Sequence, residues 1–215
     1  MTARLHVRAQ RRLIDGPAGR IEVAVDAPEA APQGLAFIGH PHPLYGGTLE
    51  NKVAATLARA FVSLGWLAVR PNFRGVGASE GEHDHGHGET DDFLHLIATA
   101  RHWLGLDADL PLALAGFSFG SFVAAQAAAR LSPPASHLVL VGAAAGKWPL
   151  PPVAAGTLVI HGEFDETIPL ADVFAWARPQ DLPVVVLPGA DHFFHRRLST
   201  LKRLVCEHVQ ARRGA

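Results

Sequence analysis

Six short segments of continuous apolar residues constrain the fold of this chain more than any other feature. They begin at Leu35 (LAFI), Trp66 (WLAV), Leu112 (LALA), Leu138 (LVLV), Leu158 (LVI) and Val184 (VVVL). A strand with one face in solvent alternates polar and apolar residues, whereas continuous apolarity is typical of strands that are covered on both faces. The six segments therefore predict a parallel sheet that is buried between two layers.

Segments with the apolar periodicity of helices separate these strands. Apolar residues recur there at intervals of three or four, within residues 53–64, 93–104, 123–131 and 198–209. Strands alternating with helices predict the α/β class, with a mostly parallel, doubly wound sheet and helices on both faces. A hairpin turning at residues 15–19 precedes them. The 215 residues show no linker, so we expect a single domain spanning residues 1–215.

Charge and cysteine content favour some partners and exclude others. Lys and Arg number 19 against 20 acidic residues, whereas a nucleic-acid-binding domain carries a marked basic excess. We therefore expect no nucleic-acid partner. Cys206 is the only cysteine and cannot form an internal disulfide, which suits a reducing compartment. We expect a cytoplasmic protein.

Two segments could be mistaken for membrane or targeting signals. Residues 110–131 have about the length of a bilayer-spanning helix, but Pro111, Gly116 and Gly120 divide them into a strand, a sharp turn and a helix. Residues 1–12 lack the apolar stretch that a secretory signal needs. The sequence therefore predicts no membrane partner.

The strand that begins at Leu112 runs into the pentapeptide GFSFG, which contains Ser118 and precedes a predicted helix. A Gly-x-Ser-x-Gly motif between a strand and a helix holds its serine at the tip of a tight turn. The glycines are needed because the two backbones nearly touch there. The helix N-terminus also favours negative charge that develops near the serine. Ser118 is thus a candidate nucleophile.

A serine hydroxyl needs a base to accept its proton and an acid to orient that base. Asp165 lies in the loop after the strand from Leu158, and His192 lies in the loop after the last strand. Loops at the carboxyl ends of parallel strands gather at one edge of the sheet. The order Ser, Asp, His also matches the triad order of such folds. We predict that Ser118, His192 and Asp165 are catalytic.

Three residues are alternatives for the acid and the base. Glu163 is two residues from Asp165 and reaches a similar point. Asp191 is adjacent to His192, although neighbouring side chains seldom orient one another productively. His195 replaces His192 as the base if the last helix begins later than predicted.

Three motifs, HPHPLYGGTLENKV, RPNFRGVGASEG and GFSFG, carry a family resemblance. The chain resembles the α/β-hydrolase superfamily and, more narrowly, the small lidless bacterial hydrolases related to dienelactone hydrolase. The resemblance runs from about residue 35 to the last helix, and the first motif is specific to the narrower group. Dienelactone hydrolase has a cysteine nucleophile where this chain has Ser118, so its substrate does not carry over.

The resemblance implies the α/β-hydrolase fold and a pair of backbone N–H groups that hold an oxyanion. One donor comes from the residue after the nucleophile, Phe119. The other comes from the loop after the first apolar strand, where the two prolines of HPHP have no N–H group. His42 is the favoured second donor, and Leu44 and Tyr45 are alternatives. Only residues 142–156 occupy the place where larger members insert a cap, so we expect no cap domain.

These residues lead to an expected activity. We expect a serine hydrolase that cleaves small carboxylic esters or thioesters through an acyl-enzyme, with a small acyl substrate and no cofactor. Tyr45, Phe117 and Phe193 are candidates for an apolar substrate pocket or for ordinary core packing. Arg74 is a candidate for binding a substrate carboxylate, although a structural salt bridge fits it better. Tyr45 and the hairpin are candidate contacts in a homo-oligomer.

Three other classes of function remain as alternatives. The first is a peptidase or amidase on the same triad, and the second is a non-catalytic binding protein on a hydrolase scaffold. The third is a metal site, for which possible ligands are His40, His42, His83, His85, His87, Asp91 and Asp92. Zinc sites need a fixed geometry and supporting hydrogen bonds, and a glycine-broken histidine run in a loop is more often solvated. We expect no metal.

Overall fold

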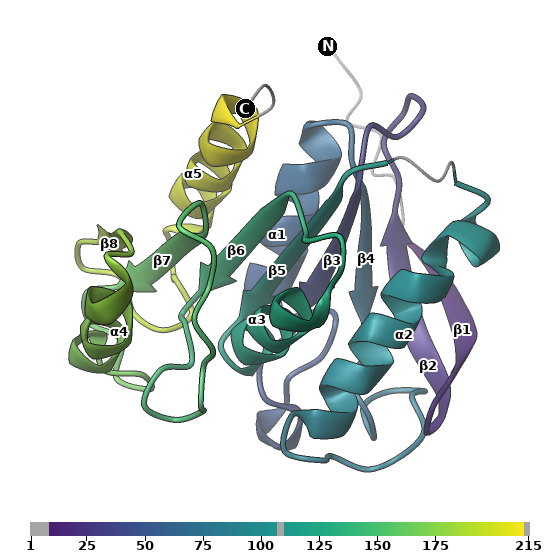
Figure 1. Cartoon of the computed structure of the whole chain (residues 1–215), viewed down its shortest axis with the longest axis horizontal. Helices are drawn as coiled ribbons and strands as arrows, with labels where there is room; N and C mark the ends of the chain where they lie inside the picture. The colour runs from purple at the N-terminus through teal and green to yellow at the C-terminus, as the bar shows by residue number, and fades with distance from the viewer. Residues whose placement is uncertain (1–8, 107–109, 213–215) are drawn as a thin grey trace.

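The computed structural model of the chain describes residues 9–106 and 110–212, and their strands form one eight-stranded sheet (Figure 1). The strands are β1 (Gln10–Gly16), β2 (Gly19–Asp26), β3 (Leu35–Gly39), β4 (Leu67–Pro71), β5 (Leu112–Phe117), β6 (His137–Val141), β7 (Leu158–Gly162) and β8 (Val184–Leu187). Their order across the sheet is β1-β2-β4-β3-β5-β6-β7-β8. Strands β3 to β8 are parallel, whereas β1 and β2 form an antiparallel hairpin that joins β4.

Helices cover both faces of this sheet. In the described residues they are α1 (Lys52–Ser63), α2 (His87–Leu104), α3 (Phe119–Arg130), α4 (Leu170–Ala177) and α5 (Leu198–Ala211). In Figure 1, α2, α3 and α4 lie in front of the sheet, and α1 and α5 lie behind it. The predicted α/β class, with its doubly wound sheet, is confirmed. The eight-residue helix α4 is an addition that the apolar periodicity does not indicate.

The core has two layers because successive side chains of a strand point to opposite faces of the sheet. Leu114 and Leu140 pack in the layer of α2 and α3, whereas Phe117 and Ile160 pack in the layer of α1 and α5. None of these four side chains is measurably exposed. Burial of a large apolar side chain stabilises a fold by about 1.5–3 kcal/mol, so both layers need apolar residues. This explains the continuous apolarity of the strands.

The sheet reverses its winding between β3 and β5. The chain passes from β3 to its neighbour β4, and then returns to place β5 on the other side of β3. Gly39 and Gly116, near the ends of these two strands, are paired in register. The loops after β3 and β5 therefore start side by side and leave in different directions, which opens the crevice where ligands bind in such sheets.

No cap covers this crevice in the part of the chain that the structure describes. The residues between β6 and β7, numbers 142–157, contain turns but no helix or strand, as expected for a lidless hydrolase. None of the described helices is long and apolar enough to cross a bilayer. The apolar segment of residues 110–131 consists of β5, a turn and α3, as predicted.

Candidate active site

Ser118 occupies the turn between β5 and α3 and has backbone angles of φ 54° and ψ −123°. A non-glycine residue in this region is strained by about 1–3 kcal/mol, so the surrounding structure must hold it there. The Ser118 N–H donates to the carbonyl of Val141 at 2.9 Å. A Cβ at Gly116 would lie 2.0 Å from the carbonyl oxygen of Gly120, and one at Gly120 would lie 2.3 Å from that of Gly39. The predicted crowding is thus present, and the turn projects Ser118 into the crevice.

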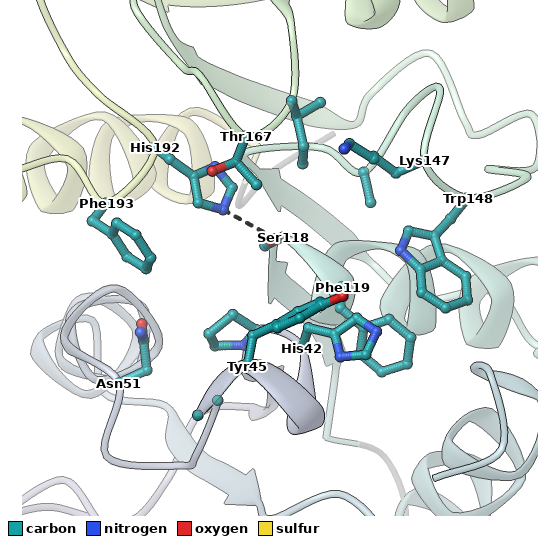
Figure 2. A pocket seen from close by; sticks show the side chains of 15 residues that line it. His42, Tyr45, Asn51, Ser118, Phe119, Lys147, Trp148, Thr167, His192 and Phe193 are labelled. Atoms are coloured by element: carbon teal, nitrogen blue, oxygen red, sulfur yellow. Dashed lines mark hydrogen bonds between the residues drawn. The ribbon is translucent and has the colours of Figure 1, made fainter.

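A chain of hydrogen bonds joins Ser118, His192 and Asp165, and Figure 2 shows the bond between His192 and Ser118. His192 Nδ1 lies 2.7 Å from Asp165 Oδ2, and His192 Nε2 lies 3.1 Å from Ser118 Oγ. Because the carboxylate only accepts, the proton of the neutral imidazole is assigned to Nδ1, and Nε2 is left to accept the serine proton. All three residues are more than nine-tenths buried. The arrangement can therefore deprotonate the serine hydroxyl.

Asp165 is held as a carboxylate by three hydrogen-bond donors and a nearby imidazole. Its Oδ1 accepts from the N–H groups of Thr167 at 2.9 Å and Ile168 at 2.7 Å. Its Oδ2, besides accepting from His192, lies 3.3 Å from Nε2 of the fully buried His161. Burial by itself would raise the pKa of Asp165, but the hydrogen bonds from His192 and Ile168 outweigh it, and the net pKa is lowered. The residue stays ionised at neutral pH.

The alternative acids and the alternative base have other partners. The Glu163 carboxylate accepts from the N–H of Gly189 at 2.8 Å. Asp191 pairs with His195, with 2.6 Å between its Oδ2 and Nδ1 of the imidazole, and His195 is largely exposed. None of the described hydrogen bonds or ion pairs of these three residues reaches Ser118, His192 or Asp165.

The loop after β3 brings His42 beside the start of α3. The N–H groups of His42 and Phe119 have no hydrogen-bond partner among the described residues, and both residues line the crevice. The N–H of Leu44, by contrast, donates to His42 Nδ1 at 3.2 Å, and Leu44 is 69% exposed and does not line the crevice. The alternative prediction of a Leu44 donor is therefore corrected, because the His42 side chain caps the short helix at Pro43–Tyr45 by accepting from this N–H.

His40, the first histidine of HPHP, ties together the loops after β3 and β4. Its Nε2 accepts from the N–H of Phe73 at 3.0 Å, and its Nδ1 lies 2.6 Å from the carbonyl of Pro41. Burial lowers the pKa of His40 to about 4, so the ring is neutral. Both nitrogens are occupied in these contacts, and His40 positions the loop that carries His42.

The buried neutral state of His40 predicts a pH-dependent stability. Between about pH 4 and its ordinary pKa of 6.5, the unfolded chain binds a proton at this residue and the folded chain does not, so stability rises with pH. Lowering the pH from 7 to 5 is expected to remove about 2 kcal/mol through His40. Urea unfolding at both pH values measures this difference. In His40→Gln the difference in unfolding free energy between pH 7 and pH 5 should be smaller by about 2 kcal/mol. An unchanged difference would refute the assignment of His40 as the buried neutral group.

The crevice is a cavity of about 470 Å³ with Ser118 and His192 in its wall. Its aromatic wall is built from His42, whose ring centroid lies 5.0 Å from that of Phe119, and from Trp148, 4.9 Å from Phe119. Of the predicted pocket residues, Tyr45 and Phe193 line the cavity and are 87% and 47% exposed. Asn51, Lys147 and Thr167 also line it (Figure 2); Asn51 lies within the motif HPHPLYGGTLENKV, whereas no motif points to Lys147 or Thr167.

Two other predicted residues lie outside the cavity. Phe117 is fully buried, and its ring lies 4.9 Å from the His192 ring, beneath the site. The prediction of a substrate contact is wrong because alternation along β5 turns Phe117 toward the layer of α1 and α5. Arg74 makes two hydrogen bonds to the Asp92 carboxylate, at 2.6 and 3.0 Å, and does not line the cavity. Its expected structural salt bridge is confirmed.

Comparisons with known proteins agree with this fold. Residues 42–156 match the sequence profile of a family described as alpha/beta hydrolase fold. The chain is 38% identical to a Xanthomonas campestris protein described as an α/β serine hydrolase without lid, with a TM-score of 0.88 and 97% of each chain covered. A serine hydrolase homologue of Coxiella burnetii is 37% identical over 93% of this chain and 97% of its own, with a TM-score of 0.81.

A sequence relative extends the match to another genus. An uncharacterized protein of Rickettsia prowazekii is 29% identical over 211 residues, which is 91% of this chain and 86% of the relative. The profile covers more than half of the chain, and the lidless architecture agrees with the Xanthomonas structure. The chain therefore belongs to the α/β-hydrolase fold family.

Proposed function

We propose that the protein is a serine hydrolase that cleaves small carboxylic esters or thioesters through an acyl-enzyme. The observation that carries the proposal is the chain of hydrogen bonds from Asp165 through His192 to Ser118, which ends at the wall of an open cavity. A buried acid, an imidazole of fixed tautomer and a serine at a strained turn supply the three functions of a nucleophilic triad.

The reaction proceeds in two steps, acylation of Ser118 and hydrolysis of the acyl-enzyme. His192 Nε2 accepts the Ser118 proton while Oγ forms a bond to the substrate carbonyl carbon. The imidazolium, stabilised by Asp165, then gives this proton to the leaving alcohol or thiol as the acyl bond breaks. Water repeats the sequence: His192 removes its proton, the hydroxide adds to the acyl carbon, and Ser118 leaves with the proton. The products are a carboxylic acid and an alcohol or thiol.

The negative charge of the tetrahedral intermediate needs donors that are already in place. The N–H groups of Phe119 and His42 are the proposed donors, since neither group has a partner among the described residues and both residues line the cavity. Phe119 also begins α3, so the helix dipole favours negative charge at this point. Removal of one such donor typically lowers kcat by about 10²–10³. Preorganised donors of this kind favour the transition state over the substrate.

The open site favours small or exposed acyl groups over long or enclosed ones. A cavity of about 470 Å³ without a cap accommodates a short acyl chain and leaves the other end of the substrate in solvent. Amide hydrolysis requires stronger protonation of the leaving group and usually a more enclosed substrate. We therefore place ester hydrolysis ahead of peptidase activity on the same residues.

A panel of chromogenic substrates tests this function. 4-Nitrophenyl esters with acyl chains of increasing length, a thioester of a short acid and an aminoacyl 4-nitroanilide are compared by kcat/KM. The short esters or thioester are expected to react fastest, and the anilide at least a hundredfold more slowly. Faster turnover of the anilide would identify a peptidase, and no turnover of any substrate would favour a binding protein.

Chelators are expected to leave this activity unchanged. The proposed steps use protein groups only, and no group of three or more metal-ligating side chains is found in residues 9–106 and 110–212. Ester turnover is measured after dialysis against EDTA and against 1,10-phenanthroline, and it should stay within about 20% of the untreated rate. Strong inhibition that added zinc reverses would revive the alternative of a metal site at the histidines.

A further inference from the structure

Lys147 lines the cavity that contains Ser118 and His192. Figure 2 shows it beside Trp148, with its side chain extending toward the middle of the cavity. It is the only lysine or arginine among the lining residues that the structure describes, and none of these lining residues is acidic. The cavity therefore carries one fixed positive charge that no carboxylate within it neutralises.

This charge has no partner elsewhere in the described chain. The Asp172 carboxylate packs against the backbone of Gly146, yet no ion pair within 4 Å joins it or any other described acid to Lys147. The imidazole of His42 carries no negative charge that could pair with Lys147. Several arginines elsewhere in the described chain are, by contrast, paired with acids, as Arg74 is with Asp92.

The turn that carries Lys147 is fixed to the nucleophile. The hydroxyl of Ser121, a fully buried residue of α3, donates to the carbonyl of Ser118 at 2.5 Å and accepts from the N–H of Ala144 at 3.0 Å. The N–H of Trp148 then donates to the carbonyl of Ala144, closing a turn around Lys147. The backbone of Lys147 thus has a set position relative to Ser118, and the flexible stem lets its ammonium group reach across part of the cavity.

We propose that Lys147 binds a carboxylate of the substrate, so that the preferred substrates are esters or thioesters bearing a carboxylate besides the bond that is cleaved. This inference rests on the proposed function and names its substrate class. A single ammonium group matches a monoanion and supplies three hydrogen-bond donors. The lack of acids in the wall removes the repulsion that a carboxylate would otherwise meet, and it favours entry of anionic substrates over neutral ones.

Two pairs of matched esters test the inference and locate the carboxylate. In the first pair the acyl group differs: the mono-4-nitrophenyl ester of glutaric acid is compared with 4-nitrophenyl pentanoate. In the second pair the leaving group differs: 4-carboxyphenyl acetate is compared with 4-acetylphenyl acetate. The ratio of kcat/KM for charged and neutral esters is measured in wild type, Lys147→Met, Lys147→Arg and Lys202→Met. Lys202 lies on α5 and not in the cavity wall, so its variant is the matched control.

Lys147→Met is expected to lower kcat/KM for the charged ester of one pair about tenfold and for its neutral partner less than twofold. The factor is modest because Lys147 is exposed and its charge is screened by solvent. Lys147→Arg should keep most of the preference for the charged ester, and Lys202→Met should keep all of it. In wild type, 0.5 M salt should weaken this preference. The pair that responds shows whether the carboxylate lies on the acyl or the leaving group.

The failure of this inference is distinguishable from that of the proposed function. If wild type hydrolyses the neutral esters and Lys147→Met leaves both ratios unchanged, the carboxylate site is wrong and the hydrolase stands. If no ester is hydrolysed, the proposed function fails, and calorimetric titration with the glutarate monoester tests the site alone. Weaker binding by Lys147→Met than by Lys202→Met would support the site, and equal binding would overturn it.

Discussion

Replacing Ser118 with alanine is expected to lower kcat for ester hydrolysis by about 10⁴-fold or more. The substitution removes the one atom that forms the acyl-enzyme and leaves His192 and Asp165 without a nucleophile to activate. Removal of a single triad member in serine hydrolases leaves only the catalysis supplied by binding and by the oxyanion donors. Initial rates with a short 4-nitrophenyl ester, measured at high enzyme concentration, resolve a loss of this size.

The fold of the Ser118→Ala variant should be intact. Alanine keeps the backbone of the turn, and the contacts of the Ser118 N–H and carbonyl to Val141 and Ser121 do not involve the hydroxyl. The free energy of unfolding is therefore expected to stay within about 1 kcal/mol of wild type. Ser63→Ala on α1 is the matched control, since its hydroxyl contacts only Ala60 of α1 and Cys206 of α5, and Ser63 does not line the cavity. Retention of a tenth of the activity by a folded Ser118→Ala would refute Ser118 as the nucleophile.

Asp165→Asn is expected to lower kcat by about 10³–10⁴-fold at pH 7 through the tautomer of His192. The N–H groups of Thr167 and Ile168 face Oδ1, so they would hold the amide oxygen of the asparagine there. The amide NH₂ would then occupy the place of Oδ2 and donate to His192 Nδ1. The imidazole would carry its proton on Nε2 and present a donor, not an acceptor, to Ser118.

Glu163→Gln is the matched control for this prediction. Glu163 lies two residues away, and its carboxylate accepts from Gly189 and not from His192. The activity of Glu163→Gln should stay within about threefold of wild type. Steady-state rates of both variants, with urea unfolding to verify that each is folded, decide between the two acids. A loss in Glu163→Gln as large as that in Asp165→Asn would contradict the assignment of Asp165.

The apolar pattern was sufficient to predict the strands because burial on both faces leaves little freedom in residue choice. Each of the six apolar segments coincides with a strand, within one or two residues. The apolar pattern did not predict the helix α4 because this helix is only eight residues long and is apolar over most of its length. Its periodicity cannot be distinguished from that of a short buried strand.

The three residues at the centre of the site could be placed together from sequence because parallel strands share one edge. Ser118, Asp165 and His192 each follow a strand, and the sheet order puts β5, β7 and β8 within reach of one another. For Phe117, the sequence left a pocket and ordinary core packing as alternatives, and its place in the core follows from strand alternation. Alternation places consecutive side chains on opposite faces.

Other parts of the site depend on contacts that no motif encodes. The choice between His42 and Leu44 rests on a cap in which Leu44 donates to the His42 ring, a detail of loop geometry. Lys147 enters the cavity because Ser121 ties its turn to α3, across a separation of 23 residues between Ser121 and Ala144. Loops of this kind are positioned by a few hydrogen bonds, and sequence periodicity carries no information about them.

Labelling with a fluorophosphonate probe, followed by peptide mapping, tests the central claim most directly, because the probe reacts only with a serine whose proton can be removed. The account predicts stoichiometric labelling of the folded protein at Ser118. It also predicts almost complete loss of labelling in Asp165→Asn and in acid-unfolded protein. Failure to label folded wild-type protein, or modification at a serine other than Ser118, would contradict it.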